Sequence, residues 1–214
     1  MNTILLPTAY LPPISWMAAM LHSENIRIEI FETYPKQTYR NRCIIATSHG
    51  KFNLSVPVKK INGNHTMTKD IMVDNSKKWQ LIHWRSIETA YSKSPYFLFY
   101  RDSLETIYHN TYEHLILLNQ DLLNTISKLL GIDIKKITFT EVYFPEPKEF
   151  NLRNSFNPKS NPHSLLASPM PRYIQTFEEI HGFLPDLSIL DILFNLGPQS
   201  KQYLANLPAI TNLY

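Results

Sequence analysis

The clearest pattern of secondary structure lies in residues 3–32, TILLPTAYLPPISWMAAMLHSENIRIEIFE. The opening run Thr3–Pro7 is apolar and short, as a buried strand is. Two consecutive prolines then precede a helical stretch at 14–23, because proline is tolerated in the first helical turn. In residues 25–32 isoleucines alternate with polar residues, and this period of two predicts a half-buried strand. The order strand, loop, helix, strand predicts a parallel pair joined by a crossover helix, which is a Rossmann-like unit.

The carboxyl ends of these two strands are the expected place for a ligand. Parallel sheets of this kind usually bind ligands at that edge, in the loops that follow the strands. The first loop begins with Thr8 and contains Tyr10, and the second begins after Phe31. We therefore expect Thr8, Tyr10 and the segment after Phe31 to lie near one rim of the sheet.

The rest of the chain predicts an α/β protein with a mixed sheet, a β-hairpin and C-terminal helices. Two strand-like runs within residues 43–58 flank Ser48-His49-Gly50, which favours the hairpin. Residues 70–74 and 137–143 favour two further short strands.

Three later segments have helical periodicity. The first starts near Ser76, and its expected buried face is Trp79, Ile82, His83, Ile87 and Ala90. The second is expected to run from a cap at Thr111 to a stop at Gly131, with the stripe Leu115, Leu118, Leu122, Ile126 and Leu129. The third is LSILDILFNLG at residues 187–197, with Ser188 as its cap.

Composition divides what we interpret as a single domain into three parts. Residues 1–144 form the expected α/β core, and residues 172–214 a helical segment that packs on it. Residues 145–171 are rich in proline, asparagine and serine and have little apolar periodicity, so they predict a long loop. Loops of this length are often functional lids. The basic residues that would let this loop close over an anion are Lys148, Arg153, Lys159 and Arg172.

Charge and cysteine content favour a cytoplasmic protein that binds a small molecule. A net charge of +3 over 214 residues is too small for a protein that coats nucleic acid. The single cysteine, Cys43, excludes an internal disulfide framework and fits a reducing compartment. The start of the sequence has no basic lead, so we expect neither a signal peptide nor an anchor, and no membrane span. The oligomeric state stays open.

A window without acidic residues is the strongest sign of a binding site. Between Glu32 and Asp70 there is no acid but seven lysines and arginines, and the charge is densest in YPKQTYRNRC, residues 34–43. Arginine presents a planar fork of donors that suits phosphate and carboxylate. We expect an anionic small molecule here, bound by Arg40, Asn41 and Arg42, with the two arginines on one face of a strand. The other candidate binding residues are Thr8, Tyr10, Gln37, Tyr39 and Lys59. The plainer alternative is a strand edge with solvated arginines.

Three side chains outside this cluster have both a chemical and a structural interpretation. His83 can act as a general base or be a core histidine on the helical face that it shares with Trp79. Cys43 can be a nucleophile or a small buried hydrophobe. Asp191 can be catalytic or stabilise the start of its helix. The histidines form no metal-binding pair and no glycine-rich phosphate loop occurs, so we expect neither metal nor cofactor.

Five stretches, YLPPISW, YPKQTYRNR, LSVPVKK, WQLIHWRSIETAYSKSPYF and LSILDILFNLG, resemble the WbqC-like family, small bacterial proteins of surface-polysaccharide gene clusters. The resemblance spans nearly the whole chain. The family positions that this sequence matches are Pro7, Thr8, Tyr10, Leu11, Pro12, Tyr39, Arg40, Asn41, Arg42, His83 and Tyr91. Pro13-Ile14-Ser15 departs from the aromatic and glycine that the family pattern has there.

The resemblance implies a role in O-antigen production, with transfer of glycine to an amino sugar as the suggested reaction. The corresponding hypothesis is a transferase that acts on an activated amino sugar, such as a nucleotide sugar. Arg40 and Arg42 would hold the phosphates, and His83 would remove an amine proton. Two alternatives stay open: a nucleotidyltransferase-like enzyme, and a non-catalytic binding or scaffold protein of a polysaccharide assembly system.

Overall fold

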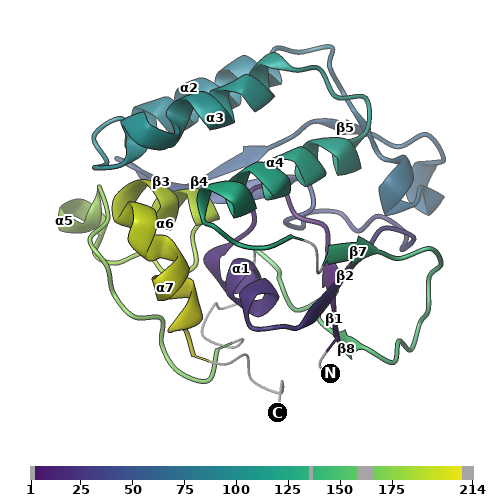
Figure 1. Cartoon of the computed structure of the whole chain (residues 1–214). Helices are drawn as coiled ribbons and strands as arrows, with labels where there is room; N and C mark the ends of the chain where they lie inside the picture. The colour runs from purple at the N-terminus through teal and green to yellow at the C-terminus, as the bar shows by residue number, and fades with distance from the viewer. Residues whose placement is uncertain (1–2, 135–136, 159–165, 209–214) are drawn as a thin grey trace.

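The computed structural model describes residues 3–134, 137–158 and 166–208, and its four-stranded sheet is parallel (Figure 1, lower right). The strand order is β7-β2-β1-β8, with β1 at Thr3–Pro7, β2 at Asn25–Glu29, β7 at Ile137–Phe139 and β8 at Phe150–Asn151. Helix α1, Ile14–Leu21, connects β1 to β2. The predicted strand, loop, helix, strand unit is confirmed.

Two antiparallel pairs form separate small sheets. The predicted hairpin is confirmed, with β3 at Arg42–Thr47 and β4 at Gly50–Ser55. Strands β5, Val58–Lys59, and β6, Met72–Val73, form the other pair, and between them lie the short 3-10 helices η1, Gly63–His65, and η2, Thr68–Asp70. The predicted α/β class with a hairpin and C-terminal helices is therefore confirmed. The sequence predicted one mixed sheet, and the structure has the parallel and antiparallel strands in separate sheets.

Three long helices lie above the sheet. They are α2, Trp79–Tyr91, α3, Phe97–His109, and α4, Leu115–Leu129. In Figure 1, α2 and α3 form the outermost layer, and α4 lies between them and the parallel sheet. The expected stripe of α4 is confirmed at Leu115, Leu118, Leu122 and Ile126, which are fully buried.

The sequence predictions for this layer were wrong in three places. Helix α4 begins at Leu115 with His114 as its N-cap, so Thr111 is not the cap. On α2, Ile82 is 60% exposed and Trp84 is buried instead. Helix α3 was not predicted at all. Its first turn exposes Leu98 and Phe99, which hides the helical period in the sequence.

The C-terminal part contains α5, Glu178–His181, α6, Ile189–Leu196, η4, Gly197–Gln199, and α7, Ser200–Ala205. Ser188 caps α6 as predicted, since its hydroxyl accepts a hydrogen bond from the Leu190 amide. Gly197 ends this helix with φ +55, and a Cβ there would come within 2.5 Å of the Tyr96 ring. Only glycine meets both demands at this turn.

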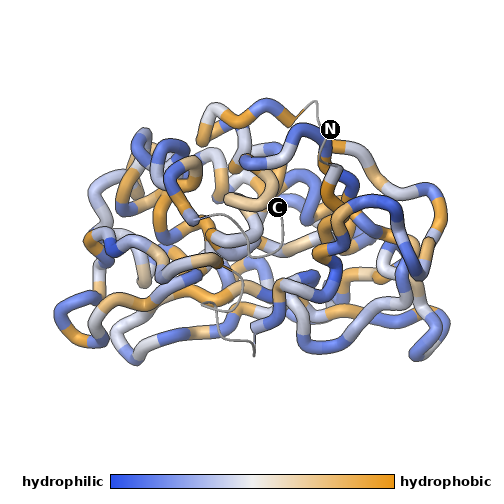
Figure 2. The backbone as a smooth tube through the Cα atoms, turned by 90° about the horizontal axis from the view of Figure 1, so that it is seen from below, coloured by the Kyte–Doolittle hydropathy of each residue, from blue (hydrophilic) through white to orange (hydrophobic). Residues whose placement is uncertain are grey.

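The chain around α1 joins the N-terminal unit to the C-terminal part. Asp186 accepts hydrogen bonds from the amide and the hydroxyl of Ser15, both at 2.8 Å, and thereby satisfies the first turn of α1. The Ile14 amide donates to the Leu187 carbonyl at 3.0 Å. Every residue of α1 from Ile14 to Met20 is buried. Along most of the tube in Figure 2, hydrophobic and hydrophilic stretches alternate, as expected where each element buries one face.

Part of the segment predicted as a loop belongs to the sheet. Strand β8 lies within residues 145–171 and pairs with β1, and the Leu152 amide donates to the Leu5 carbonyl at 2.9 Å. Among the described residues, no helix is long and apolar enough to cross a membrane.

Candidate functional site

The carboxyl ends of β1 and β2 meet at one edge of the sheet. The register pairs Pro7 with Glu29, so the loops that begin at Thr8 and at Ile30 leave the sheet side by side. Strand β8 lies on the other side of β1, so the strand order reverses between β1 and β8. Ligands of open α/β sheets usually bind at such a reversal. The edge that sequence reasoning selected is therefore the candidate site.

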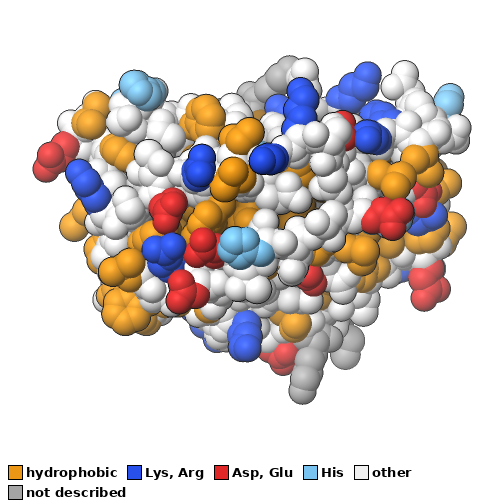
Figure 3. Space-filling model, turned by 90° about the horizontal axis from the view of Figure 1, so that it is seen from above, with side chains coloured by type: hydrophobic (Ala, Val, Ile, Leu, Met, Phe, Trp, Pro, Cys, Tyr) orange, Lys and Arg blue, Asp and Glu red, His pale blue; other side chains and the backbone are white. Residues whose placement is uncertain are grey.

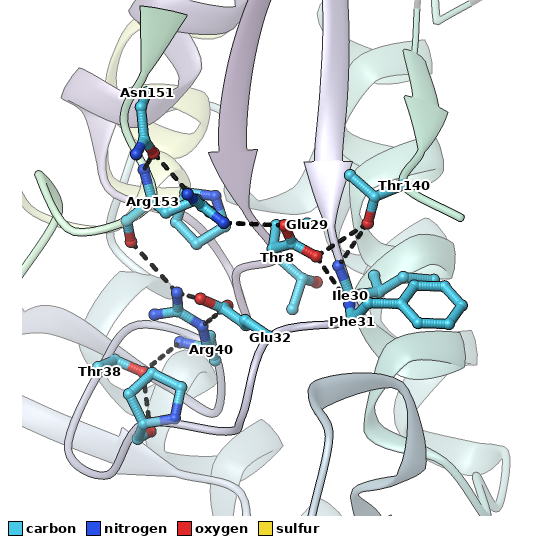
Figure 4. A network of polar contacts seen from close by, with 12 residues as sticks. Thr8, Glu29, Ile30, Phe31, Glu32, Thr38, Arg40, Thr140, Asn151 and Arg153 are labelled. Carbon is cyan, nitrogen blue, oxygen red and sulfur yellow. Dashed lines mark hydrogen bonds and ion pairs between the residues drawn. The ribbon is translucent and has the colours of Figure 1, made fainter. Parts of the chain in front are cut away.

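Two buried ion pairs occupy this edge (Figure 4). Arg153 Nη1 lies 3.2 Å from Glu29 Oε2, and Arg40 lies 2.6 Å from Glu32 Oε1. None of these four residues is more than 7% exposed. Arg40 Nη2 also donates to the Arg153 carbonyl at 3.2 Å, which links the two pairs. A buried pair is strongly destabilised when one partner is removed, because an unpaired charge is left behind.

Further hydrogen bonds fix the Glu29 carboxylate. Glu29 Oε1 accepts from the Phe31 amide at 2.8 Å and from the Thr140 hydroxyl at 2.9 Å. Burial raises the pKa of Glu32, and the nearby Arg40 guanidinium opposes this effect. Sequence reasoning missed Glu29, because its place in an alternating strand favoured the solvated face. The positive charges at the edge are thus matched within the protein.

The structure gives Arg40, Asn41 and Arg42 three different environments. Arg40 is buried in its ion pair. The Asn41 side chain donates to the Val56 carbonyl at 2.8 Å, and the Val56 amide donates back to the Asn41 carbonyl at 2.7 Å. Arg42 is half-buried at the start of β3. The expectation that Arg40 and Arg42 share one strand face is wrong, because Arg40 lies before the strand.

Arg42 is the arginine of this cluster whose charge the protein does not match. Its side chain makes no ion pair or hydrogen bond to any residue in the described part of the chain, and its Nε is buried without a partner. Tyr34 is 4% exposed, and its hydroxyl likewise has no partner among the described residues. Burial raises the pKa of Tyr34 to about 12, although Arg40 and Arg42 both lower it. Two polar groups that lack partners therefore lie in one charged neighbourhood.

Two lysines add positive charge beside Tyr34. Lys60 Nζ lies 5.2 Å from the centre of the Tyr34 ring. Partial burial lowers the pKa of Lys60, and the charge of Lys36 lowers it further, so the two ammonium groups lie close to each other. Neither lysine forms an ion pair with an acid in the described ranges. We call Tyr34, Lys36, Arg42 and Lys60 the Arg42 cluster.

The other predicted binding residues lie around these groups in different roles. Lys59 pairs with Asp74 at 3.0 Å, so its charge is matched. Tyr39 is buried, and its carbonyl accepts from the Tyr10 amide at 2.8 Å. Thr8 is 3% exposed and accepts from Asn119 Nδ2 at 3.1 Å. Gln37 is exposed in a turn with φ +59.

His83 belongs to a buried chain of hydrogen bonds. Its Nδ1 lies 2.8 Å from the Tyr10 hydroxyl, and that hydroxyl lies 2.6 Å from the Tyr108 hydroxyl. His83 also bonds to the backbone of Ser55, the β4 residue that pairs with Arg42. Burial lowers the pKa of His83 to about 4, so the imidazole is neutral at pH 7. These hydrogen bonds therefore connect the N-terminal loop, α2 and the end of the hairpin that carries Arg42.

Comparison with known proteins identifies the family. The model of the WbqC-like protein family matches residues 8–157. The chain belongs to the WbqC-like family. It is also 29% identical over 193 residues to the uncharacterized protein Rv1507c of Mycobacterium tuberculosis (strain ATCC 25618 / H37Rv). The aligned region covers 80% of this chain and 83% of the relative. No solved structure matches the chain.

The region matched to the WbqC-like family contains the whole candidate site. It begins at Thr8, includes Arg40, Arg42 and His83, and extends beyond Arg153. Asn119, which the sequence did not single out, lies in this range and donates to both Thr8 and the Arg40 carbonyl. Its amide therefore holds the two loops of the site together. No local sequence signal marks it.

Two of the four basic residues of the predicted lid have acidic partners in this WbqC-like protein, and Lys148 is exposed without an ion pair among the described residues. Arg153 is buried against Glu29, and Arg172 pairs with Glu178 at 2.7 Å. Lys159 lies outside the described residues. That residues 145–171 close over a ligand stays a prediction, but Arg153 is fixed at the sheet edge and does not belong to a separate lid.

The remaining chemical candidates of the WbqC-like chain are buried. Cys43 is fully buried, as a small hydrophobe is. The Asp191 carboxylate accepts from the hydroxyls of Tyr91 at 3.0 Å and Tyr173 at 2.5 Å, and from Gln175 at 3.1 Å. Its side chain therefore holds the C-terminal segment to α2. Asp191 lies in the first turn of α6, as predicted, but its carboxylate bonds to Tyr91, Tyr173 and Gln175 and does not cap the helix. Among the described residues, no group of three or more metal-ligand side chains could hold a metal ion.

Proposed function

We propose that this WbqC-like protein is a transferase that acts on an activated amino sugar in surface-polysaccharide synthesis. The observation that carries the proposal is the Arg42 cluster, where Arg42 Nε and the Tyr34 hydroxyl are buried without partners among the described residues. A phosphate supplies acceptor oxygens for both groups and a charge that complements Lys36 and Lys60. A nucleotide sugar is therefore the expected donor or acceptor.

The reaction that we propose forms an amide. The amine nitrogen of the bound sugar attacks the carbonyl carbon of an activated glycyl or other aminoacyl group, the leaving group of that donor departs, and the amine loses a proton. His83, through its hydrogen bond to Tyr10, is the proposed route for this proton. His83 has a pKa of about 4, so its imidazole is protonated only in acid and is neutral from pH 6 to 8. The rate should therefore be constant over that range of pH.

The direct test incubates the protein with nucleotide-activated amino sugars and either a preformed glycyl thioester or glycine with ATP, and detects the amide product by mass spectrometry. The proposal expects one sugar nucleotide to gain a glycyl mass, and expects this product to fall at least about tenfold in Arg42→Gln. Lys59→Gln is the matched control, because Lys59 is paired with Asp74.

Other outcomes would favour the alternatives. Release of AMP or pyrophosphate without an amide would support a nucleotidyltransferase-like enzyme. Absence of both product and ligand binding, together with stable association with a glycosyltransferase, would support the scaffold role and contradict the proposal.

A further inference from the structure

A cavity of about 680 Å³ lies at the opposite end of the hairpin from Arg42. It is an open hollow between the hairpin tip, one face of α2 and Phe177, and the lining residues that matter here are His49, Phe52, Ile82, Arg85, Ala90 and Phe177. Small-molecule sites have volumes of about 300 to 1,000 Å³. Strand β3 runs from Arg42 to Thr47, so about 17 Å separate this cavity from the Arg42 cluster. The cavity is therefore separate from the Arg42 cluster.

Its walls are mainly apolar although they face solvent. Phe52 is 46% exposed and Ile82 is 60% exposed, and both line the cavity with Ala90 and Phe177. Large apolar side chains that surround a hollow form the usual lining of a ligand pocket. The hairpin tip is fixed from the other side, because His181 Nε2 lies 3.0 Å from the Ser48 carbonyl. The cavity thus has mainly apolar walls, and a contact with His181 fixes the hairpin tip at its edge.

Arg85 is the one arginine or lysine in this lining, and the lining contains no acid. Its guanidinium forms no ion pair or hydrogen bond with any residue of the described part of the chain. The acid nearest in sequence, Glu88, pairs with Arg101 at 3.3 Å. An apolar hollow beside an unmatched cation complements a molecule with an apolar chain and one negative charge.

We infer that this cavity binds an amphipathic anion, an alkyl or acyl chain that ends in a phosphate or carboxylate. The chain lies against Phe52, Ile82 and Phe177, and the anionic head meets Arg85. The inference does not depend on the proposed transferase function, because it uses none of the residues of the Arg42 cluster.

The test is a calorimetric titration with octyl phosphate and decyl phosphate as monomers, with decyl maltoside as the uncharged ligand. Each buried methylene tightens binding about fourfold, so decyl phosphate should bind roughly 15-fold more tightly than octyl phosphate. Arg85→Gln should weaken decyl phosphate about tenfold or more and leave decyl maltoside unchanged.

Variants at exposed positions separate loss of the site from loss of the fold. Ile82→Gln should weaken both decyl ligands, whereas Leu98→Gln should weaken neither. Leu98 is 73% exposed on α3 and lies outside the cavity, and Figure 3 shows the outer face of the α2–α3 layer, where hydrophobic side chains lie among charged ones. Arg42→Gln should also leave binding unchanged.

Three results would overturn the inference. The first is absence of binding by decyl phosphate, and the second is equal weakening by Ile82→Gln and Leu98→Gln. The third is sedimentation with vesicles of anionic lipid that is lost in Ile82→Gln, without binding of the monomeric phosphate. That result would assign the surface to a membrane.

Discussion

The edge of the parallel sheet and the Arg42 cluster each contain an arginine of the same sequence motif. The two regions differ in whether acidic side chains pair with the arginine. At the sheet edge, Arg40 and Arg153 are buried and matched by Glu32 and Glu29. At the hairpin end, Arg42 has no partner in the described ranges. A basic motif in a sequence can therefore contain one arginine that holds the fold and another that is available to a ligand.

The largest expected difference between the two regions is in stability. Arg40→Met leaves the Glu32 carboxylate buried without its partner and should lower the free energy of unfolding by about 3 to 5 kcal/mol. Arg42→Met should change it by less than about 0.5 kcal/mol. Urea unfolding followed by circular dichroism measures both values. If the double variant Arg40→Met/Glu32→Leu recovers most of the lost free energy of unfolding, the unpaired Glu32 charge causes the loss. Equal losses in Arg40→Met and Arg42→Met would contradict the comparison.

A second difference concerns pH and tests the buried chain between the two regions. His83 has a pKa of about 4 in the folded protein and about 6.5 when unfolded. Between these values the unfolded chain binds the extra proton, so the stability that neutral His83 provides is present above pH 6.5 and decreases as pH falls toward 4.

The free energy of unfolding of His83→Gln should be lower than that of the wild type at pH 7. This difference should decrease by about 2 kcal/mol when the pH is lowered from 7 to 4.5. Urea unfolding at the two pH values measures this change. Comparison with the variant is necessary because burial raises the pKa of Asp191 to about 6, which gives stability the opposite pH dependence. A constant difference would mean that folding does not lower the pKa of His83.

The smallest expected effects distinguish two buried tyrosines. Tyr34→Phe removes a hydroxyl without a partner among the described residues, so stability should stay unchanged or rise by up to about 1 kcal/mol. Tyr10→Phe removes the bonds to His83 and Tyr108 and should cost about 1 to 2 kcal/mol. Thermal unfolding ranks the two variants. The opposite ranking would contradict the assignment of Tyr34 to a ligand site.

Periodicity predicted the elements well where one face is buried. The alternation in residues 25–32 and the leucine stripe of α4 have clear periods, and both elements formed. Helix α3 was missed because exposed Leu98 and Phe99 obscure its period. Strand β8 is two residues long and has no period to detect.

The site was predicted less completely because its partners are distant in sequence. Arg40 donates to the carbonyl of Arg153, which is 113 residues away in sequence. The carbonyl of Arg40 accepts a hydrogen bond from Asn119, which is 79 residues away. Glu32 borders the acid-free window, so a search for acids within that window could not find it. Charge patterning locates a basic segment but does not show which cation the fold neutralises.

Anion binding by variants of neighbouring cations would show whether Arg42 holds a ligand. Calorimetry would measure the dissociation constant of a nucleotide-activated amino sugar, and of pyrophosphate, for the wild type, Arg42→Gln, Lys60→Gln and Lys59→Gln. We predict a loss of at least about tenfold in Arg42→Gln, a smaller loss in Lys60→Gln and none in Lys59→Gln, because Asp74 already matches Lys59. Equal losses in all three variants, or an unchanged constant in Arg42→Gln, would contradict the account.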